Sequence, residues 1–106
     1  MIKVRVLSSQ RMKQILYYEM DYMEFDKLVN KHIPAFKGDY EFVACHEANN
    51  YAAYTFNVEM PKDDKSYLDI ERKILLGEDR YTRYILMYLV KLGVLAPGNY
   101  LINVFW

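Results

Sequence analysis

The sequence predicts a single α+β domain over residues 1–106, a mainly antiparallel sheet of about five strands covered by helices in the order ββαββααβ. Three observations predict this class. Several runs alternate apolar and polar residues, which is typical of strands with one buried face. A capped run with helical spacing follows the first two of these runs. Two further helical runs, each ended by a glycine, precede the last strand.

Composition supports a folded chain. At 106 residues and 12.7 kDa the protein has the size of one domain. Hydrophobic residues make up 53% and charged residues 26%, which excludes an intrinsically disordered or collagen-like chain. The formal net charge is zero, so no general electrostatic field draws the protein toward phosphate backbones or anionic lipid.

The first two predicted strands lie at residues 1–6 and 13–20. In the first segment apolar residues alternate with Lys3 and Arg5, which predicts one buried face. The second segment is short, rich in tyrosine and immediately followed by a helix start, which favours a strand paired with the first. The same residues could also begin one long helix, and the sequence leaves that alternative open.

A helix is predicted to begin after Asp21 and to stop at Pro34. Asp21 and Glu24 have the spacing of a capping box, in which each side chain accepts a hydrogen bond from the other residue's backbone. Proline disfavours helical backbone in the residue before it. The apolar stripe of this helix is Phe25, Leu28, Val29, His32 and Ile33. We expect this stripe to pack on the sheet.

Residues 40–59 predict a hairpin around Asn49-Asn50, because asparagine tolerates the positive φ angles of a type I′ turn. The register then pairs Glu47 with Ala52, Cys45 with Tyr54, Val43 with Phe56 and Glu41 with Val58. That face is largely apolar, and we expect it to pack against Phe25, Leu28 and Ile33. The opposite face, which carries Tyr40 and Phe42, is predicted to be half-exposed.

The C-terminal half predicts two helices and a strand. A polar connector over 61–65 leads to a helix with Ser66 and Asp69 as its cap pair and Gly77 at its end. A second helix is predicted from about Asp79 to Leu92, ended by Gly93. The alternating residues 100–106 predict a last strand, with its aromatic end docked on the domain.

No catalytic, metal or cofactor site is predicted. Cys45 and His46 are neighbours on a strand, so their side chains point to opposite faces and cannot form a nucleophile–base pair. His46-Glu47 lacks the second histidine of a His-Glu-x-x-His zinc site. The four glycines are too far apart for a phosphate-binding loop. We therefore predict that the protein is not an enzyme and binds no cofactor.

The sequence also favours a cytoplasmic protein that is not inserted in a membrane. The alternating N-terminus does not resemble a signal peptide. The longest apolar stretch, 84–95, contains Lys91 and is shorter than a bilayer span requires. A single cysteine, Cys45, cannot form an intramolecular disulfide and suits a reducing compartment.

Eleven tyrosines are the distinctive feature of the composition. Tyr81, Tyr84, Tyr88 and Leu92 form one ridge of the second C-terminal helix, which is apolar over most of its circumference. One sheet can cover only part of it. We expect the ridge to be covered by the preceding short helix, by a second copy in a homodimer, or by another protein, since tyrosine is enriched at interfaces.

The preferred function is a small protein-interaction module, an accessory or inhibitory protein of a phage or other mobile element, acting by occlusion or assembly. The alternative is a nucleic-acid-binding domain that uses the first hairpin. Its candidate contacts are Lys3, Arg5, Arg11, Lys13 and Tyr17. An ordinary solvated strand with basic residues along a sheet edge explains the same pattern. A third possibility is an enzyme whose site carries no recognisable motif, with a ligand between sheet and helices.

Overall fold

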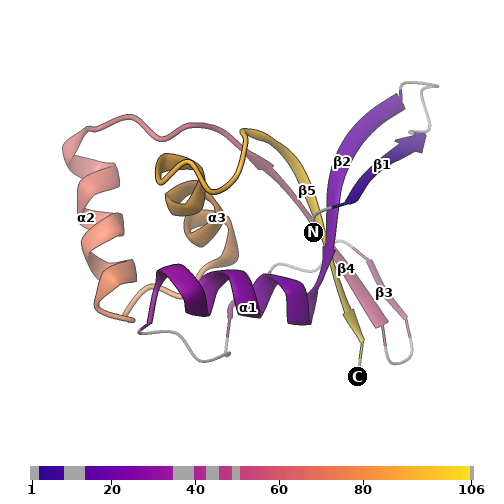
Figure 1. Cartoon of the computed structure of the whole chain (residues 1–106), viewed down its shortest axis with the longest axis horizontal. Helices are drawn as coiled ribbons and strands as arrows, with labels where there is room; N and C mark the ends of the chain where they lie inside the picture. Colours follow the sequence, from indigo (N-terminus) through magenta and orange to yellow (C-terminus); the bar gives the residue numbers. More distant parts are fainter. Residues whose placement is uncertain (1–2, 9–13, 35–39, 43–45, 49–50, 106) are drawn as a thin grey trace.

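The computed structural model describes residues 3–8, 14–34, 40–42, 46–48 and 51–105, and it confirms the α+β class. The strands are β1 (Lys3–Ser8), β2 (Gln14–Asp21), β3 (His46–Ala48), β4 (Tyr51–Val58) and β5 (Gly98–Phe105). The helices are α1 (Tyr22–His32), α2 (Lys65–Leu75) and α3 (Thr82–Lys91). The helices lie on one side of the sheet, α1 and α3 next to it and α2 outside α3 (Figure 1).

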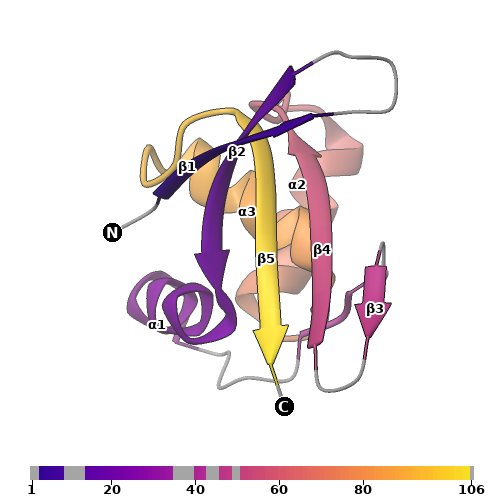
Figure 2. The same cartoon turned by 90° about the vertical axis from the view of Figure 1, so that its right-hand side faces the viewer.

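The strand order in the sheet is β1-β2-β5-β4-β3 (Figure 2). β5 lies between β2 and β4, parallel to β2 and antiparallel to β4. Of the four strand pairings in the described part of the chain, three are antiparallel, as predicted, and the parallel β2–β5 pair makes the sheet mixed. The cause is a long-range return: α2 and α3 bring the chain back to the end of the sheet where β4 stops, so that Gly98 pairs with Val58. The hairpin patterns in the sequence do not indicate where a strand that follows two helices joins the sheet.

Helix α1 follows its sequence signals closely. The Asp21 side chain accepts a hydrogen bond from the Glu24 backbone N–H at 2.8 Å, and the Glu24 side chain accepts one from the Asp21 N–H at 3.2 Å. This confirms the predicted capping box. The helix ends at His32, two residues before Pro34. Four residues of its predicted apolar stripe pack in or against the core: Phe25, Leu28, Val29 and Ile33. The fifth, His32, is half-buried and does not belong to the core cluster.

The hairpin register agrees with the prediction where the structure describes it. Glu47 pairs with Ala52. The predicted turn at 49–50 and the partners at 43–45 lie outside the described residues. The predicted pair of Glu41 with Val58 is wrong, because the backbone of Glu41 instead forms a bridge with the segment before α3. Its N–H donates to the Arg80 carbonyl at 2.9 Å, and its carbonyl accepts from the Thr82 N–H at 3.0 Å.

Tyr40 and Phe42 were expected on a half-exposed face. This prediction is wrong for Tyr40, which is buried. Phe42 is half-buried, and its ring stacks on Tyr54 with 4.4 Å between centroids. Both rings also contact Phe25 of α1. Residues 40–42 precede the described part of β3, and Glu41 pairs with Tyr81, the residue before α3. The alternation of side chains along the β3–β4 hairpin therefore does not predict which way the side chains of 40–42 point.

The caps of α2 and α3 differ from the predicted ones. The N-cap of α2 is Asp64, which accepts from the Tyr67 N–H at 2.9 Å, and Ser66 donates its hydroxyl to the same carboxylate. The Ser66–Asp69 cap pair is therefore wrong. α3 begins at Thr82 instead of Asp79, because the bridge to Glu41 uses backbone groups of the intervening residues.

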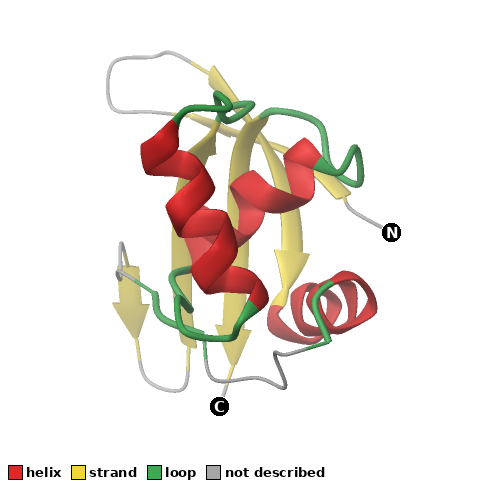
Figure 3. Cartoon of the chain, turned by 90° about the vertical axis from the view of Figure 1, so that its left-hand side faces the viewer, coloured by secondary structure: helices red, strands yellow, loops and turns green. Residues whose placement is uncertain are grey.

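The core lies between the sheet and the inner helices (Figure 3). Phe25, Ile33, Phe56 and Val58 are buried together, with Leu28 and Tyr54 half-buried beside them. This confirms the described part of the predicted core; Val43 and Cys45 lie outside the described residues. The expected docking of the C-terminal aromatic end is wrong for Phe105, which is 67% exposed, and Trp106 is not described.

Candidate interaction surface

The predicted tyrosine ridge lies on α3, which is packed between the sheet and α2 (Figures 1 and 3). Tyr84 and Tyr88 are half-buried and pack against the core. Tyr81 meets Tyr84 edge to face, with 5.1 Å between ring centroids. No residue from Thr82 to Lys91 is exposed, whereas Leu92 is 46% exposed. The apolar circumference of α3 is thus largely covered within the chain, and Leu92 is the ridge residue that presents apolar surface.

A charged cluster joins α2 to α3 on the ridge side. The Lys91 Nζ lies 2.7 Å from Glu71 Oε1, 3.1 Å from Asp63 Oδ1 and 5.2 Å from the centre of the Tyr67 ring. The hydrogen bond to Glu71, and then the one to Asp63, raise the pKa of the Lys91 ammonium. Burial, and secondly the Glu71 charge, raise the pKa of the Tyr67 hydroxyl. With Ile74 buried beside this cluster, α2 is anchored by both apolar and ionic contacts.

Large apolar side chains nevertheless remain exposed elsewhere. They are Leu16, Met23, Met60, Leu68, Leu75, Leu76, Leu92 and Phe105. Three of them, Leu16 at 52%, Met60 at 55% and Leu92 at 46%, come from segments that are distant in sequence.

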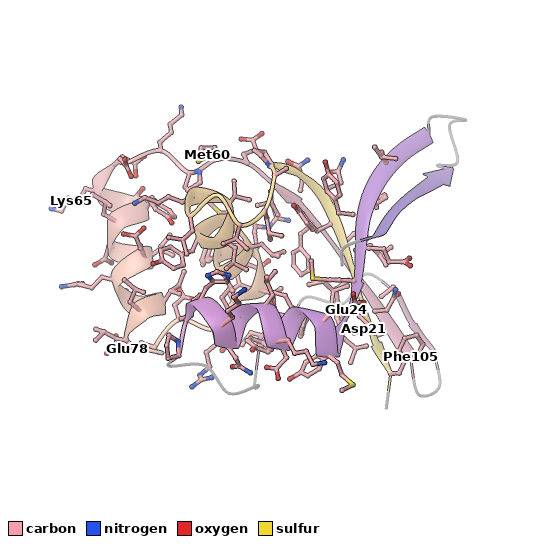
Figure 4. The ribbon with its side chains drawn as sticks, viewed as in Figure 1. Asp21, Glu24, Met60, Lys65, Glu78 and Phe105 are labelled. Carbon is pink, nitrogen blue, oxygen red and sulfur yellow. The ribbon has the colours of Figure 1, made fainter. Side chains whose placement is uncertain are left out.

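The strand pairing places two of these residues, Leu16 and Met60, toward the end of the sheet where β5 begins, whereas Leu92 follows the end of α3. Val58, two residues before Met60, pairs with the first residue of β5. Tyr18, two residues after Leu16, pairs with Tyr100 near that same start. The contact between Lys91 and Asp63 brings the end of α3 beside the connector that carries Met60, labelled in Figure 4.

Leu16 is exposed because the β1–β2 hairpin projects beyond the helices (Figure 1). At the base of this hairpin, the Tyr18 ring packs 5.1 Å from the Tyr100 ring. A side chain at position 98 would put its Cβ 2.9 Å from Tyr18, so Gly98 permits this close contact. Beyond Tyr18 the helix-side face of the strand continues to Leu16 without a helix over it. Alternation alone predicts that Leu16 is buried like Tyr18 and Met20, so sequence reasoning missed this residue.

The structure brings some of the candidate nucleic-acid contacts together. Arg5 pairs with Tyr17 across β1 and β2, and Tyr17 pairs with Asn99 of β5. Lys3 pairs with Glu19, which places a carboxylate residue next to the basic ones. Arg11 and Lys13 lie outside the described residues. The strand face opposite the helices therefore combines basic, aromatic, amide and acidic positions.

Neither a metal cluster nor a membrane helix is found in the part of the chain that the structure describes. No group of three or more His, Cys, Asp or Glu residues there could hold a metal ion. None of the described helices has the length and apolar character needed to cross a bilayer. Comparison with protein-family models, curated proteins and solved structures finds no match to this chain.

Proposed function

We propose that the protein is a small interaction module that self-associates in the cytoplasm and acts, as an accessory or inhibitory protein, by occlusion or assembly. One observation carries the proposal. Eight large apolar side chains among the described residues are at least 43% exposed, and exposed apolar surface of this kind marks interaction sites on small proteins.

The shape of the molecule contributes to this exposure. The radius of gyration is 14.0 Å, compared with about 13 Å for a typical domain of this length. The projecting β1–β2 hairpin and the outer position of α2 extend the molecule (Figure 1). A net charge of zero gives little repulsion against association.

Tyr84 and Tyr88 are half-buried and pack against the core, which favours an internal role for these residues. The proposed contact therefore lies at the exposed end of the tyrosine ridge, Leu92, and at the other exposed apolar residues. The surface that meets a partner is then mainly aliphatic.

Sedimentation equilibrium from about 1 to about 100 μM tests the proposal, since a weak homodimer dissociates in this range. We expect the average mass to rise toward twice the chain mass with increasing concentration. A constant monomer mass over the whole range would contradict self-association.

A second candidate, binding of single-stranded nucleic acid, is favoured by one observation: the pairing that aligns Arg5, Tyr17 and Asn99 across three strands. An aromatic ring between a cation and an amide can stack on a base while the cation meets a phosphate. Titration of a fluorescent oligonucleotide at several salt concentrations tests this candidate. Affinity that falls with salt and is lost in Tyr17→Ala would support it.

A further inference from the structure

We draw no further inference here: the strongest candidate, the open pocket of about 270 Å³ between the β4–α2 connector, α2 and Met87 of α3, is lined by side chains of both charge signs, and nothing in the described part of the structure shows which ligand or partner would occupy it.

Discussion

Helices α1 and α3 both pack on the same face of the sheet, yet the ends and the packing of α1 can be predicted from the sequence more fully than those of α3. α1 carries one apolar stripe, a capping box and a proline stop, and each feature acts where local reasoning places it. α3 is apolar nearly all round, has an N-cap residue, Tyr81, without a side-chain hydrogen bond, and begins later than predicted.

The difference lies in the number of layers that each helix touches. α1 meets the sheet with one face and can leave its polar face to water. α3 lies between the sheet and α2, so it needs apolar residues on both sides. The apolar residues of α3 extend over more of its circumference than those of α1, so their spacing does not indicate which neighbour covers which face. The four predictions below test this comparison.

The largest expected effect concerns the single buried face of α1. Phe25→Ala should lower the free energy of unfolding by about 3–5 kcal/mol, because it removes a fully buried ring that contacts Tyr40 and Phe42. Chemical denaturation measures the loss. Met23→Ala, on the exposed side of the same helix, should cost less than about 0.5 kcal/mol. Equal losses of unfolding free energy in both variants would contradict the conclusion that α1 buries only one face.

The second prediction addresses the outer face of α3. Tyr88→Glu should cost at least about 2 kcal/mol, because it places a charge among half-buried side chains beneath α2. Leu92→Glu, on the same ridge but exposed, should change the stability of the dilute monomer by less than about 0.5 kcal/mol. A folded, fully stable Tyr88→Glu variant would show that α2 does not cover this face.

The third prediction compares the two helix starts. Asp21→Ala should cost about 1 kcal/mol, since it removes the acceptor for the Glu24 N–H. Tyr81→Phe keeps the ring that contacts Tyr84, and the N-cap of α3 has no side-chain hydrogen bond to lose. Its thermal midpoint should therefore match the wild type. A comparable loss in both variants would show that the two starts are stabilised alike.

The smallest expected effect concerns the ionic contact between α2 and α3. Glu71, and then Asp63, raise the pKa of Lys91, so its stabilisation is complete below the ordinary lysine pKa and is lost as the pH rises through the higher folded-state pKa. Lys91→Met should lower the thermal midpoint at neutral pH. As the pH is raised into the alkaline range, the thermal midpoint of this variant should fall less steeply than that of the wild type. Lys73→Met, which removes an exposed pair within α2, is the control. If the thermal midpoint of Lys91→Met falls in alkali as steeply as that of the wild type, the Lys91 contact does not stabilise the packing of α2 on α3.

Much of the local structure was predictable because its determinants are close together in the chain. The Asp21–Glu24 cap spans one helical turn, and the Glu47–Ala52 pair follows from the residues between them. The ends of α2 and α3 follow from Gly77 and Gly93, whose φ angles of 75° and 78° favour glycine. The exposure of the candidate residues was less predictable: Leu92 of the predicted tyrosine ridge is exposed, whereas Tyr84 and Tyr88 are half-buried against the core.

The sequence by itself determined the α+β class, the α1 cap and the described part of the β3–β4 register, because backbone hydrogen bonding over a few residues decides each of them. The tertiary structure alone decided that β5 enters between β2 and β4, that Phe42 packs on Tyr54, and that α3 lies between the sheet and α2. These features depend on burying apolar surface between segments far apart in the chain. Alternation and helical spacing show which face of a strand or helix is apolar, and only the packed chain shows which segment lies against that face.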